Sequence, residues 1–210
     1  EVPDPSRYGL LAGAVPGRVS AWIEKPSAEV TAGYPGPHHV NAGIYVLDAA
    51  LFRQTACHGA FSMEKDFFPE ALGRGVPFFL HALTGPWRDI GTPDSYLEAN
   101  LEALRGEGPS RRGFEGVEGR RVQSEEREDG PVFLPPSLVG PGASISPGAQ
   151  IGPGAVIGAA CVVEAGARIS RSVLCMGVRV GAGAVLDRVI AGPGAVVAAG
   201  ARPAPLSVLI

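Results

Sequence analysis

The C-terminal third of the chain repeats an apolar pattern every six residues. Large apolar residues hold one phase of the repeat, at Phe133, Val139, Ile145, Ile151, Ile157, Val163 and Ile169. Mostly small residues hold a second phase four positions later, at Ser137, Ala143, Ala149, Ala155, Cys161, Ala167 and Val173. The register slips by one residue at Leu174 and again at Ala191. A repeat this regular indicates a stack of similar structural units.

A period of six predicts short strands joined by tight turns. Three such units close one coil of roughly 18 residues, and successive coils stack at the usual strand spacing of about 4.8 Å. The large apolar residue then points into the coil, and Gly140, Gly152 and Gly158 supply turn conformations that other residues resist. The pattern resembles that of hexapeptide-repeat proteins. The resemblance implies a left-handed parallel β-helix over residues 131–210.

Two functions are open for such a solenoid. Many hexapeptide-repeat proteins are acyltransferases that use a histidine as general base. Here every histidine precedes the repeat, at His38, His39, His58 and His81. A structural stack that docks on another domain or subunit is therefore favoured, and a homo-oligomer formed through the β-helix is expected. We expect the apolar tail, residues 206–210, to cover the open end of the coil or to meet a neighbouring chain.

The N-terminal part alternates strand and helix patterns. Expected strands cover residues 7–12, 18–23, 43–47 and 78–83, and expected helices cover residues 48–54, 62–72 and 93–104. Ser62 is the expected N-cap of the second helix, with Phe67, Phe68 and Leu72 facing inward. This alternation is typical of an α/β fold.

A charged, glycine-rich stretch separates the two parts. Residues 105–130 contain almost no large aliphatic side chains, and their charges are mixed in sign. This composition predicts a solvated connector. The expected organisation is an α/β domain at residues 1–104, a linker at 105–130 and the β-helix at 131–210.

Composition excludes several classes of protein. The formal net charge is −3 and the basic residues are scattered, so no nucleic-acid partner is expected. No apolar run approaches the roughly 18 residues that a membrane span needs, so no membrane partner is expected. Three cysteines without a CxxC pair predict a reduced, cytoplasmic protein, with Cys161 and Cys175 as packing residues. The chain begins at Glu1 and is interpreted as a processed, engineered or partial sequence.

Four short motifs place polar groups beside strand ends and glycines. They are Tyr8-Gly9, Glu24-Lys25-Pro26, Asn41-Ala42-Gly43 and Trp87-Arg88-Asp89-Ile90-Gly91-Thr92. Taken singly, each is equally typical of a solvated strand end or an ordinary turn. Asp89 lies between an apolar run and a helix start, a place where α/β proteins often hold metal or substrate ligands.

The order of these motifs resembles that of the sugar-1-phosphate nucleotidylyltransferases. The series YG, EKP, NAGIYVL, FSMEKDFFP and WRDIGTPDSYLEAN, followed by hexapeptide repeats, is similar to the mannose-1-phosphate guanylyltransferase or glucose-1-phosphate thymidylyltransferase type. The resemblance covers nearly the whole chain. It implies the C-terminal part of a Rossmann-like nucleotide-diphospho-sugar transferase domain followed by the β-helix, and it leaves the sugar and the base open.

The resemblance also implies residue roles. Gly9, Asn41 and Gly43 would line the sugar pocket, and Glu24 would accept hydrogen bonds from sugar hydroxyls. Lys25 would bind the sugar phosphate as a point charge.

In the motif around Asp89, the resemblance implies a metal site. Asp89 would be one of two carboxylates that hold Mg2+, and Gly91 would shape the loop together with Thr92, a further substrate-binding residue. The implied reaction joins a sugar 1-phosphate to a nucleoside triphosphate and releases pyrophosphate, with Lys25 and Asp89 as the catalytic residues.

One half of such an enzyme is not found in this sequence. The family's glycine-rich phosphate-binding loop has a superficial counterpart in residues 9–13, but that stretch belongs to the YG hairpin. We expect the chain to lack the nucleotide-binding half and to be inactive alone. A non-catalytic regulatory or scaffolding subunit is the alternative, and a pure sugar-phosphate binder is a third possibility. The coding sequence immediately upstream distinguishes the first two, because it either contains the glycine-rich loop in frame or does not.

Overall fold

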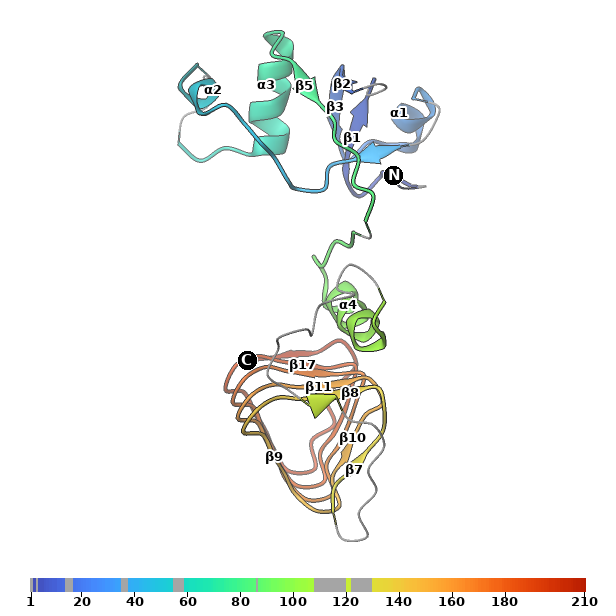
Figure 1. The fold of residues 1–210 in the computed structure, drawn as a ribbon, viewed down its shortest axis with the longest axis vertical. Coiled ribbons are helices and arrows are strands. Elements are labelled where there is room, and N and C mark those ends of the chain that lie inside the picture. The colour runs from blue at the N-terminus through green and yellow to red at the C-terminus, as the bar shows by residue number, and fades with distance from the viewer. Residues whose placement is uncertain are drawn as a thin grey trace. The chain divides into compact units, whose positions relative to one another are not determined.

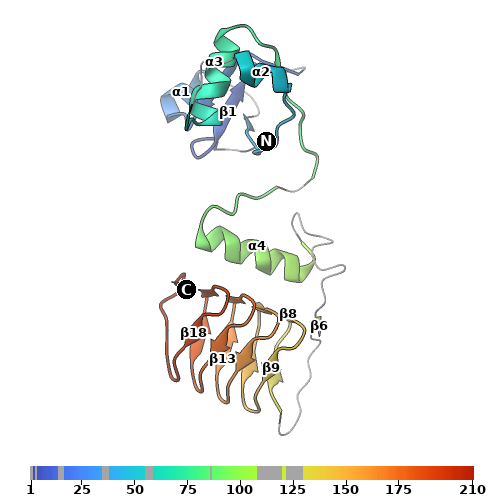
Figure 2. The ribbon, with the colours of Figure 1, turned by 90° about the vertical axis from the view of Figure 1, so that its left-hand side faces the viewer.

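The computed structural model describes residues 2, 4–13, 17–34, 38–54, 59–85, 87–107, 120–121 and 130–210. The chain consists of two compact units, residues 1–84 and 85–210, and each is described by itself (Figures 1 and 2). The second unit contains the solenoid together with the helix at residues 93–105, which the sequence-based division had placed in the α/β domain. Among the described residues, no helix has the length and apolar character needed to cross a bilayer.

A small antiparallel sheet organises the first unit. Its central strand β1 (Gly9–Ala12) pairs with β3 (Ala21–Glu24) on one side and with β4 (His39–Val40) on the other. A second pair joins β2 (Arg18–Val19) to β5 (Phe78–Phe79). Helix α1 (Ala28–Ala32) follows β3, and the side chain of Ser27 caps its N-terminus.

Aromatic side chains pack the helices of the first unit onto this sheet. Helix α2 (Ala49–Gln54) is followed by a π-helical turn η1 (Met63–Phe67), which continues into α3 (Phe68–Gly73). The expected N-cap is confirmed, because the Ser62 hydroxyl accepts a hydrogen bond from the Lys65 amide. The Phe68 ring is fully buried against Trp22 of β3, with ring centroids 4.4 Å apart.

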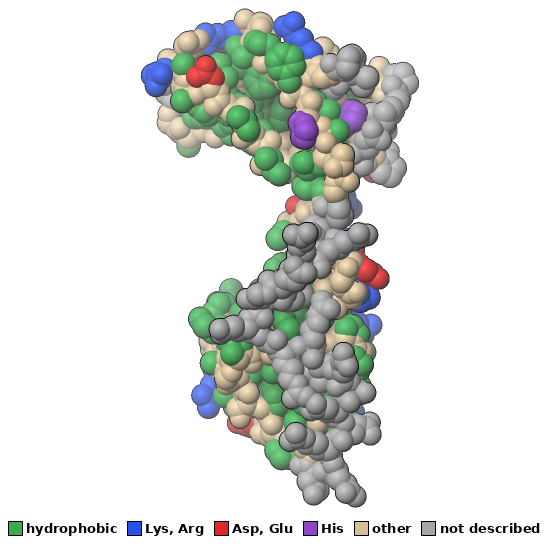
Figure 3. Space-filling view, in the orientation of Figure 1, with side chains coloured by type: hydrophobic (Ala, Val, Ile, Leu, Met, Phe, Trp, Pro, Cys, Tyr) green, Lys and Arg blue, Asp and Glu red, His purple; other side chains and the backbone are tan. Residues whose placement is uncertain are grey.

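Two of the expected strands are absent or shortened. Residues 43–47 form no strand, and Ile44 and Val46 are 72% and 100% exposed. The strand expected at residues 78–83 is limited to β5. A β-strand needs a hydrogen-bonding neighbour, and no described segment supplies one here. On the face shown in Figure 3, hydrophobic side chains form much of the surface of the first unit.

The second unit contains the predicted parallel β-helix. One sheet stacks β7 (Val132–Phe133), β10 (Gln150–Ile151), β13 (Arg168–Ser170) and β16 (Val185–Asp187). The next stacks β8 (Ser137–Val139), β11 (Ala155–Ile157), β14 (Val173–Leu174), β17 (Ile190–Ala191) and β19 (Val208–Leu209). The third stacks β9 (Ser144–Ile145), β12 (Val162–Val163), β15 (Arg179–Val180) and β18 (Val196–Val197). All pairings between these strands are parallel, which is consistent with the expected left-handed β-helix.

The two phases of the repeat fill the interior of the coil. Both phases are fully buried in the middle coils, as Ile157 and Ala149 show. The register slips reflect a change in coil length. Ile151 pairs with Ile169, 18 positions on, whereas Ile169 pairs with Leu186, 17 positions on. A coil one residue shorter still stacks, because the missing residue comes from a turn.

Close approach between coils explains two of the glycines in the repeat. A Cβ on Gly158 would lie 2.7 Å from the backbone of Cys175, and one on Gly140 would lie 2.7 Å from the Ala159 amide nitrogen. Neither glycine has a positive φ, so the expectation that they supply special turn angles is wrong for them. Gly152 has a φ of 100°, and a Cβ there would also collide with the backbone of Leu134.

Helix α4 (Pro93–Arg105) runs across the stacked coils (Figure 2). Its apolar face, with Leu97 and Leu104, is buried. A Cβ added to Gly154 of the solenoid would come within 2.5 Å of the Leu101 side chain, which shows how closely the helix and the coil approach. Gly106, with a φ of 77°, ends the helix in the left-handed conformation that glycine adopts easily.

The ends of the solenoid differ from the simple repeat. Strand β6 (Arg120–Arg121) pairs antiparallel with β8, so part of the expected linker is a strand. At the C-terminus β19 extends one sheet, and its Leu209 packs against the core of the solenoid, whereas Val208 and Ile210 are 50% and 106% exposed. The expected contact of this tail with a neighbouring chain stays a prediction.

The cysteines of the solenoid are unpaired. Cys161 is fully buried, and its thiol donates a hydrogen bond to the Cys175 carbonyl at 3.0 Å. Burial raises the pKa of the Cys161 thiol, which disfavours the reactive thiolate. Cys57 lies outside the described residues.

We expect Thr92→Ala to destabilise the first turn of α4 by about 1 kcal/mol, because Thr92 and Ser95 form a reciprocal capping box. Amide hydrogen exchange at residues 93–97 measures this effect. Ser144→Ala, on an exposed strand position of the solenoid, is the control. Equal exchange in the two variants would contradict the capping role.

Candidate functional site

Four residues singled out in the sequence lie together at one end of the sheet in the first unit. Gly9 at the start of β1 stands opposite Glu24 at the end of β3. The Lys25 amide donates to the Tyr8 carbonyl at 3.0 Å, and the Asn41 amide donates to the Gly9 carbonyl at 2.9 Å. The hairpin and β4 therefore place a carboxylate, an ammonium and an amide on neighbouring strand ends.

Gly9 is required by the close approach of two side chains. A Cβ at this position would lie 2.9 Å from Glu24 Oε2 and 3.2 Å from Trp22 Nε1. Trp22 Nε1 is buried and has no hydrogen-bond acceptor within the described residues. Buried donors without a partner are rare in folded proteins. The Glu24 carboxylate and the Trp22 indole N–H thus lie directly against the Gly9 backbone.

Lys25 has an unusual backbone conformation for a side chain of its size. Its φ is 50°, in the left-handed region that non-glycine residues seldom adopt. Residues held in this region cluster at functional sites. The Lys25 side chain is exposed, and no ion pair to it is found within the part of the chain that the structure describes.

A chain of hydrogen bonds fixes the side chain of Asn41. Its Oδ1 accepts from the Gly43 amide at 2.8 Å, and its Nδ2 donates to the Tyr45 hydroxyl at 2.5 Å. The Tyr45 hydroxyl donates in turn to Glu64 Oε1 at 3.1 Å. Burial, followed by the contact with Glu64, raises the pKa of Tyr45 to about 12. The phenol therefore stays protonated and remains a donor to Glu64.

Sequence reasoning named Asn41 and Gly43 but missed their supports, Tyr45 and Glu64. Tyr45 follows Asn41 by four residues in the same motif, and Glu64 lies in the first turn after the Ser62 cap. For Tyr45 the available signal was a polar hydroxyl within an otherwise apolar run, whereas Glu64 lies in a polar stretch and carried no comparable signal.

The remaining predicted residues belong to the second unit. Asp89 is exposed, and its Oδ1 accepts a hydrogen bond from the Gly91 amide at 3.0 Å. The Thr92 hydroxyl accepts from the Ser95 amide at 3.1 Å and so acts as a helix cap. The convergence of Asp89 and Thr92 with the four residues of the first unit stays a prediction.

The Asp89 side chain fits the role of one magnesium ligand, but a complete site needs further ligands. Mg2+ is typically held by one or two carboxylates together with water and phosphate oxygens. The second oxygen of Asp89 accepts no hydrogen bond from any described residue, so it is free to be a ligand. Among the described residues, no three histidine, cysteine, aspartate or glutamate side chains converge as a metal site.

Both parts of the chain match known families. The profile of the nucleotidyl transferase family matches residues 1–106, and that of the GMPPB C-terminal domain matches residues 133–209. The chain belongs to the nucleotidyl transferase family.

Curated relatives cover most of this chain. Mannose-1-phosphate guanylyltransferase of Mycobacterium tuberculosis is 29% identical over 89% of this chain and 46% of its own length. Mannose-1-phosphate guanylyltransferase 1 of Arabidopsis thaliana is 32% identical over 86% of this chain and 45% of its own length. Glucose-1-phosphate adenylyltransferase of Bacillus cytotoxicus is 26% identical over 94% of this chain and 53% of its own length. The chain thus spans about half the length of the curated relatives it matches.

Proposed function

We propose that this chain forms the sugar-phosphate side of a nucleotidyltransferase that joins a sugar 1-phosphate to a nucleoside triphosphate. The observation that carries the proposal is the grouping of Gly9, Glu24, Lys25 and Asn41 at one end of a sheet in a member of the nucleotidyl transferase family. Relatives named as mannose-1-phosphate guanylyltransferases favour mannose 1-phosphate and GTP as the substrate pair.

Each side chain of the group has a task in this reaction. Glu24 accepts hydrogen bonds from sugar hydroxyls, and the glycine opposite it lets the Glu24 carboxylate lie close to the β1 backbone. Asn41, held by Tyr45, offers its second amide hydrogen to a sugar oxygen. Lys25 neutralises the sugar phosphate, whose oxygen attacks the α-phosphorus of the nucleotide while pyrophosphate leaves.

Asp89 is the proposed carboxylate for magnesium. Mg2+, when bound, would neutralise phosphate charge during the transfer. One carboxylate with water ligands holds the ion only loosely, and the family resemblance implies a second carboxylate and a phosphate-binding loop in the nucleotide-binding half of such an enzyme. The chain alone is therefore expected to release no pyrophosphate from mixtures of nucleoside triphosphates and sugar phosphates, and turnover by the pure chain would contradict this assignment.

Calorimetric titration of the chain with mannose 1-phosphate, glucose 1-phosphate and inorganic phosphate tests the sugar site. We expect Glu24→Gln to weaken sugar 1-phosphate binding roughly 10- to 100-fold, since a hydrogen bond to a charged group contributes about 1.5–3 kcal/mol. Binding of inorganic phosphate should stay unchanged. Glu29→Gln on the exposed helix α1 is the matched control. Equal losses in the two variants would overturn the role of Glu24.

A further inference from the structure

The turns of the solenoid place one residue in the left-handed conformation every five or six positions. Glycine holds most of these places, at Gly142, Gly148, Gly154, Gly166, Gly177, Gly183, Gly194 and Gly200, and the exceptions are Ala160, Arg171, Arg188 and Leu206.

The two arginines among the exceptions lie in one corner of the solenoid. Arg171 and Arg188 have φ of 44° and 56°. Both stand in the corner column that begins at Gly154, because the Arg171 amide donates to the Pro153 carbonyl and the Arg188 amide to the Ser170 carbonyl. A bulky side chain in this conformation is strained. An arginine at such a position therefore points to a compensating interaction of its side chain.

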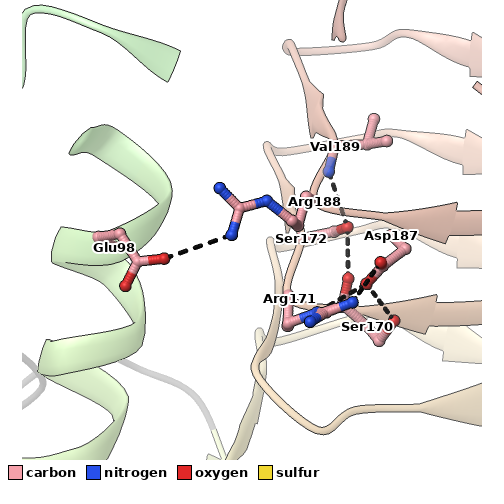
Figure 4. A network of polar contacts seen from close by, with 7 residues as sticks. All are labelled: Glu98, Ser170, Arg171, Ser172, Asp187, Arg188 and Val189. Atoms are coloured by element: carbon pink, nitrogen blue, oxygen red, sulfur yellow. Dashed lines mark hydrogen bonds and ion pairs between the residues drawn. The ribbon is translucent and has the colours of Figure 1, made fainter. Parts of the chain in front are cut away.

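The two arginines have different partners (Figure 4). Arg171 pairs with Asp187 of its own solenoid, at 2.9 Å from Nε to Oδ1, and this contact holds the pKa of Asp187 below its ordinary value. Arg188 instead bonds to helix α4. Its guanidinium donates to Asp94 and lies 3.6 Å from Glu98. Asp94 and Glu98 are one helical turn apart, so a single guanidinium spans the first two turns of α4.

The turns that Arg188 contacts follow directly on the Asp89 loop. Thr92 caps α4, and Asp89 lies three residues before the cap. Ile190 lies two residues after Arg188 in the solenoid. It lines a shallow pocket together with residues 90–93 and 96, which include the Thr92 cap and its neighbours on both sides. Arg88, beside Asp89, is bonded to Glu102 of the same helix, with Nε 3.0 Å from Oε2. The loop is thus bonded to α4, and α4 is bonded to the solenoid.

We propose that Arg188 is a positioning residue through which the β-helix holds the Asp89 loop for magnesium binding. The inference rests on the proposed function, in which Asp89 is a metal ligand. It gives the solenoid a part in the active site that a purely structural stack would not have. Exposed ion pairs add little to stability, so the effect of Arg188 should fall on the geometry of the loop rather than on the fold of the solenoid.

Arg188→Gly tests this role without damaging the fold. Glycine relieves the strained backbone, so the unfolding midpoint of the solenoid should be unchanged or raised while the contact with α4 is lost. Arg171→Gly is the matched control, because it makes the same change one coil earlier at an arginine paired with Asp187. Arg188→Lys should restore part of the effect, since an ammonium is a compact point charge without the forked geometry.

Mn2+ is the probe, and its paramagnetic broadening of the Gly91 amide signal in NMR is the measurement. We expect Arg188→Gly to raise the Mn2+ concentration that broadens the Gly91 signal by half about 3- to 10-fold, because a charge-assisted contact is lost. For the same reason, amide exchange at residues 91–96 should become at least about 3-fold faster. Arg171→Gly should change neither.

The possible outcomes distinguish a failure of the positioning role of Arg188 from a failure of the proposed metal role of Asp89. Equal values in wild type and Arg188→Gly, or equal shifts in both glycine variants, would overturn the positioning role. Absence of broadening at Gly91 in the wild type would overturn the metal role of Asp89, and the inference with it, whereas the exchange rates still report whether Arg188 holds the loop.

Discussion

Truncation of Ile157 to alanine is expected to lower the free energy of unfolding by about 2–5 kcal/mol. Ile157 is fully buried in β11 and is paired with Val139 and Leu174 on the neighbouring coils. Removing its side chain leaves a cavity that three coils share, and a solenoid has no other core with which to compensate.

Urea unfolding followed by circular dichroism measures this change, with the slope against denaturant as a check on two-state behaviour. Val196→Ala is the control, because Val196 is an aliphatic strand residue of the same solenoid that is 74% exposed. Its effect should stay within about 0.5 kcal/mol. Comparable losses at both positions would mean that the repeat does not define the core.

Replacement of Lys25 by alanine should weaken the binding of sugar 1-phosphate and of inorganic phosphate together, by roughly 10- to 100-fold. The reason is that, in the proposed function, Lys25 supplies a point charge to the phosphate, whereas Glu24 supplies hydrogen-bond acceptors to the sugar. Glu24→Gln is therefore expected to weaken the binding of sugar 1-phosphate alone, whereas Lys25→Ala should weaken the binding of both sugar 1-phosphate and inorganic phosphate. The same calorimetric titrations measure both.

Lys65→Ala is the matched control for charge, since Lys65 is an exposed lysine of the same unit in the turn η1. Lysine and alanine both carry a Cβ and are both strained at the positive φ of position 25, so the unfolding midpoint should be the same before and after the Lys25 substitution. A loss of affinity equal to that of Lys65→Ala would show that the effect is one of net charge. Retained phosphate binding would overturn the assignment of Lys25.

The repeat shows how far sequence reasoning reaches when each unit contacts only its neighbours. The spacing of Ile151, Ile157 and Ile169 predicts which residues point inward, because the same position of each six-residue unit faces the interior of the coil. The register slips at Leu174 and Ala191 correspond to the shorter coils in the structure. In such a fold the local sequence pattern therefore largely determines the tertiary packing.

The first unit shows where the same reasoning fails. Residues 43–47 have the composition of a strand, yet they form none, because strand formation depends on a partner that composition does not reveal. The Ser62 cap was predictable, since a cap is decided within four residues. The family resemblance implied that Gly9, Glu24 and Asn41 would share a site, but only the hairpin register brings Gly9 opposite Glu24.

By itself the sequence determined the period of the solenoid, the helix caps and the identity of the polar groups at the strand ends, because these depend on neighbours along the chain. The tertiary structure decided the hydrogen bonds from Asn41 through Tyr45 to Glu64, the unused donor of Trp22 and the contact of Arg188 with α4. These contacts join segments up to 94 positions apart. Hydrogen bonds and ion pairs act only over a few ångströms, so they exist only once the fold has brought such segments together.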